Sequence, residues 1–281
     1  MAEQSVPAPL IDAHVHTFRA DMPVMPDAWT RLDYAFPTDS LIALLDAHGV
    51  RHAVVSGLSI AGTYNDYTLA AVRAHKRLRG TVIVDPAAEP EALKRMRDAG
   101  IVGMRLQLAR HATLPDVRSD PYRQLLHRAR DLGWHVHVAI EGPRLPPLLD
   151  ALLESGINIV IDHFGHPDPA DPLNCAGYRA MIAAVDSGRV WIKLAAGFRL
   201  PGTEAWRDDP EGDLDMLADQ VAADLLARVG SQRLLWGSDA PFVGYERRVS
   251  YARVLESYRR WVPDPAVRAE IDRTAIALYF A

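Results

Sequence analysis

Apolar runs and amphipathic stretches alternate from one end of this chain to the other. Each apolar run is short and rich in Val, Ile and Leu, as in a buried parallel strand, and a helix-sized segment separates it from the next run. The runs are residues 10–18, 51–57, 81–85, 101–108, 134–140, 158–164, 190–198 and 233–240. Eight strand and helix repeats predict an α/β fold, the closed (β/α)₈ or TIM barrel, with residues 1–281 as a single domain. The alternative is a doubly wound open sheet, although the chain lacks the glycine-rich phosphate fingerprint of many such sheets.

Glycines and long connections mark the borders of the predicted elements. Seven glycines follow an amphipathic stretch and precede an apolar run, where a left-handed residue commonly ends a helix. They are Gly49, Gly80, Gly100, Gly133, Gly156, Gly188 and Gly230. Residues 18–38 and 199–213 form long connections after the first and seventh strands, so they are predicted to cover a pocket. Their aromatic residues Trp29, Tyr34 and Trp206 could pack over a ligand or simply anchor the loops.

The composition narrows the classes of partner. A formal charge of −5, a pI near 6.1 and the lack of a Lys/Arg run argue against nucleic acid. No apolar run reaches the roughly 18 residues that a membrane span needs. The single cysteine, Cys175, cannot form an internal disulfide, and the first ten residues carry no secretion signal, so a cytoplasmic protein is expected. The expected partner is a small anionic substrate, and the oligomeric state stays open between monomer and homo-oligomer.

Two histidines lie at the end of the first predicted strand. Side chains alternate along a strand, so His14 and His16 project from one face, with Asp12 one layer below. Histidines at this spacing can hold one metal ion or polarise one substrate oxygen. They could equally be hydrogen-bonded core residues or surface groups.

Other strands end in polar residues that are costly to bury. These are Arg105 and Gln107 on the fourth strand, His137 on the fifth, His163 on the sixth, Arg199 after the seventh and Asp239 on the eighth. A buried polar group without a partner costs about 2 to 7 kcal/mol, so a ring of them at one end of a barrel requires mutual pairing or a ligand. We therefore expect these residues to form the active site.

Individual roles follow from the chemistry of each group. Asp239 is the candidate general base, with a helix N-cap as the alternative. His163 could donate a hydrogen bond to a carbonyl or ligate a metal. Arg105 and Arg199 could hold a substrate carboxylate in a bidentate fashion, or could pair with an acidic residue of the chain. Gln107 and His137 are expected to contact the substrate.

Two further residues are expected to have structural roles. Lys193 lies deeper in the seventh strand, where it is expected to pair with Asp12. Asp162 is expected on the opposite face of the sixth strand, where it would cap or pair structurally.

Five motifs together resemble a known family. They read HVH, DHFGHPD, VWIKLAAGFR, LLWGSDAPF and TAIALYF, in the order in which the family has them. The chain resembles the amidohydrolase superfamily over nearly its whole length, within the amidohydrolase-2 branch of 2-pyrone-4,6-dicarboxylate lactonase and related sugar-acid lactonases. The eighth-strand motif departs from the branch, with Ala240 in place of a Trp, and the fifth strand carries His137 where another polar residue is more common.

The resemblance implies a hydrolase that opens a carboxylated lactone or a related ester or amide. Asp239 would activate water, and Arg105 and Arg199 would hold substrate carboxylates. The groups that would polarise the carbonyl are His14, His16 and His163. The same histidines and Asp239 could hold one zinc or manganese ion, but the branch includes metal-independent enzymes, and an obligatory metal is not expected. No lysine ends the fourth strand, which argues against a binuclear centre.

Two rival functions remain at this point. One is a zinc-dependent decarboxylase of small aromatic acids on the same scaffold. The other is a barrel that binds a ligand without turnover, although the intact Asp239 argues against it.

Overall fold

The fold is a closed parallel barrel. The computed structural model describes residues 8–200 and 216–281. Eight parallel strands follow one another around the sheet in chain order. They are β1 (Ile11–Val15), β2 (His52–Val55), β3 (Leu78–Val82), β4 (Ile101–Gln107), β5 (His135–Ala139), β6 (Asn158–Ile161), β7 (Val190–Ala195) and β8 (Leu234–Gly237). The ring closes where the Asp239 N–H donates to the His14 carbonyl and the His16 N–H to the Ala240 carbonyl, both at 2.8 Å. This closure confirms the barrel and excludes the open sheet.

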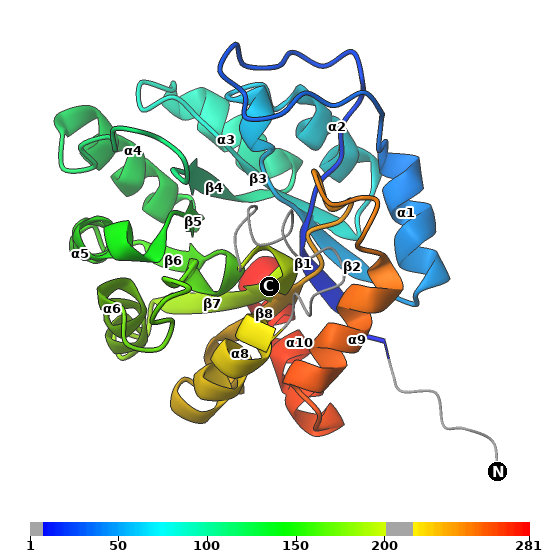
Figure 1. Cartoon of the computed structure of the whole chain (residues 1–281). Coiled ribbons are helices and arrows are strands. Elements are labelled where there is room, and N and C mark those ends of the chain that lie inside the picture. Colours follow the sequence, from blue (N-terminus) through cyan, green and yellow to red (C-terminus); the bar gives the residue numbers. More distant parts are fainter. Residues whose placement is uncertain (1–7, 201–215) are drawn as a thin grey trace.

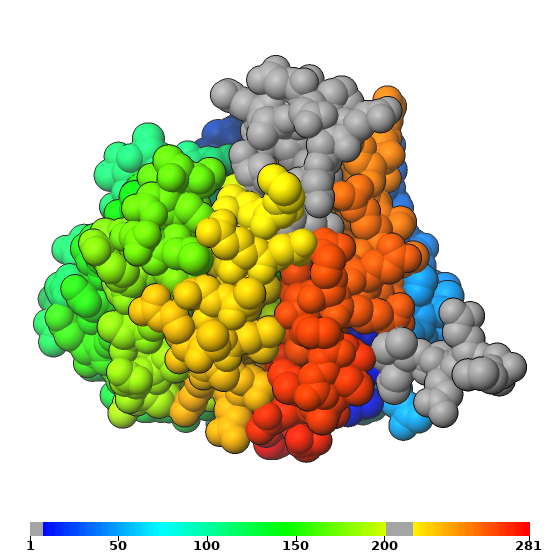
Figure 2. All heavy atoms as spheres, turned by 60° about the horizontal axis from the view of Figure 1, so that its bottom comes forward, coloured from blue at the N-terminus to red at the C-terminus, as the bar shows by residue number. Residues whose placement is uncertain are grey.

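Helices surround the ring of strands (Figure 1). They are α1 (Thr38–Ala47), α2 (Asp66–Ala74), α3 (Pro90–Ala99), α4 (Asp120–Asp131), α5 (Leu145–Glu154), α6 (Ala176–Val185), α8 (Met216–Arg228), α9 (Tyr251–Trp261) and α10 (Pro265–Tyr279). Short 3₁₀ turns are η1 (Ser59–Ala61), η2 (Gly142–Arg144), η3 (His163–Gly165), η4 (Gly197–Arg199) and η5 (Ser231–Arg233). Figure 2 shows part of this outer layer, where green, yellow and red segments follow one another across the surface. Among the described residues no helix is long and apolar enough to cross a membrane.

Six of the seven predicted helix-ending glycines have a positive φ, between 73° and 113°. The prediction for Gly80 was wrong. Gly80 lies inside β3, which begins at Leu78, three residues before the predicted strand, and α2 has already ended at Ala74. A Cβ at position 80 would lie 2.8 Å from the Ile101 side chain and 2.9 Å from the Thr68 side chain. Here glycine serves the close packing of α2 on the sheet rather than a turn.

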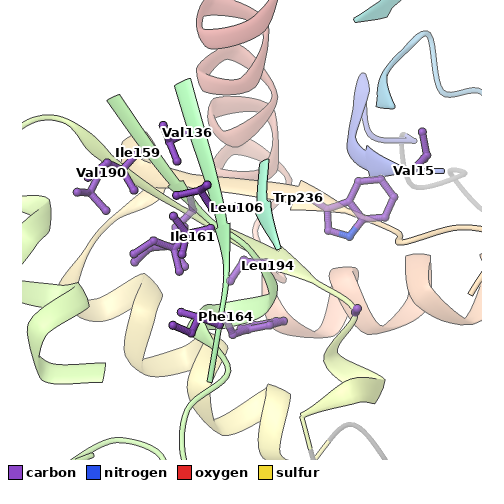
Figure 3. Close-up of a cluster of buried hydrophobic side chains, with 14 of the residues drawn as sticks. Val15, Leu106, Val136, Ile159, Ile161, Phe164, Val190, Leu194 and Trp236 are labelled. Atoms are coloured by element: carbon purple, nitrogen blue, oxygen red, sulfur yellow. The ribbon is translucent and has the colours of Figure 1, made fainter. Parts of the chain in front are cut away.

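Two apolar layers support the barrel. The larger fills the space between the strands and the helices, and includes Val136, Ile159, Ile161, Leu194 and Trp236 (Figure 3). The smaller lies inside the barrel at the N-terminal ends of the strands. It joins strand residues to the last helix, and its members are Ile11, Ala13, Val54, Val160, Leu235, Ala275 and Tyr279. Because α10 closes this end, the polar side chains gather at the opposite one.

Candidate active site

A pocket of about 530 Å³ opens at the C-terminal ends of the strands. Its volume is typical of small-molecule sites. Six of the predicted site residues line it: His16, Arg105, Gln107, His163, Arg199 and Asp239. Trp29 of the long connection after β1 also contributes to the wall, as predicted for that loop. Residues 201–213 of the second long connection, with Trp206, lie outside the described residues.

Asp239 lies at the centre of the polar cluster. Its Oδ1 is 3.4 Å from His14 Nε2 and 3.4 Å from His16 Nε2, and its Oδ2 accepts a hydrogen bond from Arg199 Nε at 2.7 Å. Burial alone would raise the pKa of Asp239, but Arg199 and the histidines lower it by more, to well below the ordinary value. The carboxylate is therefore ionised. The His163 ring completes the cluster, with its centroid 4.8 Å from that of His14.

The backbone around Asp239 excludes the helix-cap alternative. The next helix, α9, begins only at Tyr251 and has Ser250 as its N-cap. Asp239 itself has a φ of 66°, a left-handed conformation that a non-glycine residue rarely adopts. Other non-glycine residues with positive φ lie on the connections after the strands, and these include His163, Phe164, His166, Ala196 and Phe242. Such clusters of backbone strain are characteristic of functional sites.

The arginines have partners within the chain as well as a face in the pocket. Arg105 Nε donates to Asp162 at 2.9 Å, and its Nη1 donates to the Gly57 carbonyl at 2.9 Å. Arg199 is held by Asp239, and its guanidinium lies 4.6 Å from the centre of the Tyr245 ring. The pairing alternative is thus realised for both arginines. Both still line the cavity, where a ligand carboxylate could share the guanidinium groups.

The buried residues beneath the pocket differ from the sequence-based prediction. Lys193 does not pair with Asp12: its Nζ lies 3.1 Å from Asp162 Oδ1. Asp12 instead accepts hydrogen bonds from the Ser238 N–H and the Tyr251 hydroxyl, both at 2.9 Å. The β1–β2 pairing is irregular between Asp12 and Val15, and the strict alternation assumed for β1 therefore fails. Asp12 turns toward α9 while His14 turns into the barrel.

Asp162 was correctly expected to pair, but the predicted position on the opposite face was wrong. It lies inside the barrel, fully buried, 3.4 Å from His14 Nδ1. Burial alone would raise its pKa, but Lys193, His14 and Arg105 hold the pKa well below the ordinary value. Asp162 is therefore an ionised counter-charge for the cations around it.

His14 and His137 lie below the pocket rather than in its wall. Both side chains are fully buried, and neither lines the cavity. Burial and then Lys193 lower the pKa of His14 to about 3, so its ring is neutral near pH 7. His137 Nδ1 is 3.1 Å from Lys193 Nζ, a position that does not support the predicted substrate contact. Gln107 does face the cavity, and among the described residues its buried Oε1 has no hydrogen-bond partner.

The pocket wall also contains residues that were not predicted, among them Arg110, His166 and Tyr245. Arg110 lies just beyond β4, with its guanidinium 4.4 Å from the centre of the Trp29 ring. His166 lines the pocket with its pKa lowered to about 3 by burial and by His163. Tyr245 follows β8 in a loop. Arg110 lies five residues after Arg105, just beyond the same strand, and this position could have suggested that it reaches the pocket. Tyr245 lies in a loop, where no periodic pattern indicates which side chains face the pocket.

The donor atoms around Asp239 lie close enough together to be candidate metal ligands. Among the described residues, two groups of three donors lie within 4.8 Å of one another: His14, His16 and Asp239, and His14, Asp162 and His163. His16 and His163 place Nδ1 against backbone carbonyls, at 2.9 Å and 3.3 Å, which leaves Nε2 free for a metal. His14 fits poorly, because its Nδ1 lies 3.2 Å from Lys193 Nζ, and an ammonium at that position requires the ring proton to be on Nε2. Both groups include His14, so its contact with Lys193 disfavours either group as a metal site.

Comparisons with known proteins identify the family of this chain. The amidohydrolase family model matches residues 11–280. The chain is 26% identical to a 4-sulfomuconolactone hydrolase from Rhizobium radiobacter over 274 residues, which are 95% of this chain and 88% of that protein. It is also 26% identical to a 2-pyrone-4,6-dicarboxylate hydrolase from Comamonas testosteroni over 245 residues, 84% of this chain and 78% of that protein.

Two solved structures extend the comparison. A probable 2-pyrone-4,6-dicarboxylic acid hydrolase from Acinetobacter baumannii, with citric acid bound, has a TM-score of 0.88 at 26% identity, over 96% of this chain and 99% of that chain. An amidohydrolase from Burkholderia multivorans with bound zinc has a TM-score of 0.78 at 23% identity, over 97% of this chain and 99% of that chain. The second likeness shows the shared fold alone.

Proposed function

Because the chain belongs to the amidohydrolase family, we propose that it hydrolyses a lactone that carries a carboxylate or a similar anionic group. The observation that carries the proposal is the position of the ionised Asp239 carboxylate. It lies 3.4 Å from two imidazole nitrogens, in a pocket that three arginine side chains line. A base, polarising groups and anion-binding groups therefore face one small volume.

The proposed reaction is attack of water on the lactone carbonyl. Asp239 takes a proton from the water, and the oxygen of that water forms a bond to the carbonyl carbon. The cationic Arg105 and Arg199 side chains, which both reach the pocket, stabilise the negative charge that develops on the carbonyl oxygen. His16 and His163 direct Nδ1 at backbone carbonyls, so they present Nε2 lone pairs rather than donors to the pocket. The bond from the carbonyl carbon to the ring oxygen then breaks, and the ring oxygen takes the proton that Asp239 accepted from water. His14, which lies beneath the pocket, orients Asp239 rather than touching the substrate.

The substrate class is inferred from three arginines in the pocket wall, which also includes the acidic side chains Glu141, Asp168 and Asp239. Arg105, Arg110 and Arg199 bring guanidinium groups to the wall, and planar guanidinium groups match carboxylate or sulfonate oxygens. The names of the relatives point the same way, because they describe a sulfonated lactone and a pyrone dicarboxylate as substrates. Gln107 offers a further polar contact at the cavity floor.

We propose that the reaction needs no metal, because Lys193 faces His14 Nδ1 and so leaves the ring proton on Nε2, the nitrogen that a metal would need. A zinc-dependent decarboxylase would need that same nitrogen, and no feature of the described site favours it. The chain also offers a general base, which a barrel that only binds a ligand would not require.

The test is hydrolysis by the purified protein, followed with a pH indicator. The panel contains 2-pyrone-4,6-dicarboxylate, 4-sulfomuconolactone, and neutral lactones of similar size. Hydrolysis of the anionic compounds with a higher kcat/KM than the neutral ones supports the proposal. A lack of turnover across the panel, or equal turnover of charged and neutral compounds, contradicts it.

A further inference from the structure

Lys193 is a buried cation that the proposed reaction does not use. It lies on β7 with no exposed surface, at a position where a barrel interior normally holds an aliphatic residue. An ammonium group has three N–H donors and no acceptor. Three acceptor atoms surround Lys193 Nζ: His137 Nδ1 at 3.1 Å, Asp162 Oδ1 at 3.1 Å and His14 Nδ1 at 3.2 Å. The two histidine contacts are hydrogen bonds, and the contact with Asp162 is an ion pair.

From these contacts we infer that Lys193 is a positioning residue that fixes the tautomer of His14 and, through it, the orientation of Asp239. The Nδ1 atom of His14 must present its lone pair to the ammonium, so the one proton of the neutral ring is on Nε2. That N–H faces Asp239 Oδ1 at 3.4 Å. The distance is long for a hydrogen bond, as contacts between catalytic groups often are before substrate binds. The role of Lys193 in turnover rests on the proposed function, but the tautomer does not.

His16 and His163 show that this tautomer is a property of one position. Their Nδ1 atoms face the Ser56 and Ala195 carbonyls, which can only accept, so both rings carry the Nδ1 proton. In His14, by contrast, Nδ1 faces the Lys193 ammonium. The neutral His14 ring therefore carries its proton on Nε2, whereas the neutral rings of His16 and His163 carry it on Nδ1.

Asp162 explains how the ammonium is maintained inside the barrel. Burial lowers the pKa of Lys193, and the ionised Asp162 opposes this shift. Asp162 also accepts from Arg105, which lines the pocket. A continuous set of contacts thus runs from Arg105 through Asp162, Lys193 and His14 to Asp239. Removing Lys193 would leave His14 Nδ1 free to carry the proton and to donate it to Asp162 Oδ1, 3.4 Å away.

The tautomer can be read by NMR without any substrate. Histidine is labelled with ¹⁵N, and long-range correlations between ring carbon-bound protons and nitrogens distinguish the two tautomers. The His14→Gln variant identifies the His14 signals by their loss. We expect the Nε2–H form in the parent protein and the Nδ1–H form in Lys193→Met. An Nδ1–H form in the parent, or the same tautomer in both proteins, would overturn the inference.

Kinetics then test the link from Lys193 to turnover. We expect Lys193→Met to lower kcat by about 10- to 100-fold and to leave KM within about threefold of the parent value. Losses of this size are typical when a residue that orients a reactive side chain is removed. Lys193→Gln keeps N–H donors and should recover part of that loss. Ile11→Ala, at the N-terminal end of the barrel, is the control for lost stability and should keep the parent kcat. Equal kcat values for Lys193→Met and Ile11→Ala would overturn the positioning role. If the parent hydrolyses no lactone, the proposed function fails and the NMR result alone decides the tautomer.

Discussion

The two ends of this barrel are built from opposite kinds of side chain. At the N-terminal end, small and branched apolar residues such as Ala13, Val54 and Val160 meet α10 and exclude water. At the C-terminal end, Asp239, His14 and neighbouring charged groups occupy an equally buried space. Apolar burial stabilises the fold directly, whereas buried charges stabilise nothing unless each has a partner.

The difference separates the end that stabilises the fold by apolar packing from the end at which we propose the chemistry. Asp162 and Asp239 each contact at least one arginine and one histidine. These carboxylates remain ionised in a dry interior because cations surround them. Their arrangement serves reactivity, while the opposite end supplies free energy of folding. Variants at the two ends should therefore change different measurements.

The largest expected effect is on turnover at the C-terminal end. Asp239→Asn should lower kcat by about 10²- to 10⁴-fold, because the amide cannot accept the proton from water. The unfolding midpoint in urea should change little, since the shape is kept. Asp98→Asn, on the exposed surface of α3, is the control and should keep the parent kcat. Near-normal turnover of Asp239→Asn would remove the base assignment.

The next effect is on stability at the N-terminal end. Ile11→Ala should lower the free energy of unfolding by about 2 to 5 kcal/mol, because it leaves a cavity among buried side chains. Turnover per folded molecule should be unchanged. Urea unfolding and active-site titration measure the two quantities. A large loss of kcat in fully folded protein would show that the two ends are coupled.

A third variant separates the binding of the substrate's negative charge from the rate of the chemical step. Arg199→Met should raise KM for anionic lactones by about 10- to 100-fold, as expected for loss of a charge-assisted contact. Arg199 also contacts Asp239, so kcat is expected to fall for charged and neutral lactones alike. The ratio of kcat/KM between an anionic and a neutral lactone is the diagnostic quantity. An unchanged ratio would place the anion elsewhere.

The pH dependence of stability probes a buried histidine near α10. Burial lowers the pKa of His135 to about 4 from an ordinary 6.5, so the folded state resists its protonation. This contribution to stability is present above pH 6.5 and is lost as the pH falls from there toward 4. His135→Gln should reduce the loss of unfolding free energy between pH 7.5 and 5 by roughly 1 to 2 kcal/mol.

Urea unfolding at both pH values measures this loss, and His127→Gln, on the exposed side of α4, is the control. An equal loss in His135→Gln and the parent would contradict the assignment.

The smallest expected effect is that of a chelator. Dialysis against EDTA should leave kcat unchanged, because the His14 nitrogen that a metal would need carries a proton. Metal analysis of the purified protein accompanies the assay. Activity that is lost on chelation and restored by zinc or manganese would contradict the hydrogen-bond pattern proposed for His14.

Much of this site could be predicted from the sequence because strand ends in a parallel barrel must meet. Residues as distant as His16 and Asp239 come together at 3.4 Å for this reason alone, and no knowledge of packing was required. The same logic placed Arg105, Gln107, His163 and Arg199 in the pocket. That residues 1–281 form one domain stays a prediction.

The errors arose where the backbone departs from regular geometry. Strict alternation placed Asp12 beneath His14, but an irregularity in β1 turns it toward α9. The same reasoning placed Asp162 outside the barrel, whereas it is the buried partner of Lys193. Arg110 and Tyr245 lie on loops, whose positions no periodicity describes.

The sequence by itself determined the barrel, the end at which polar residues gather and most of the groups in the pocket. These depend on the periodicity of apolar residues, which is local and repeats along the chain. Only the tertiary structure decided which cation faces which carboxylate and which nitrogen of His14 carries the proton. Hydrogen-bond partners depend on distances of a few ångströms between segments far apart in the chain, and such distances are set by packing.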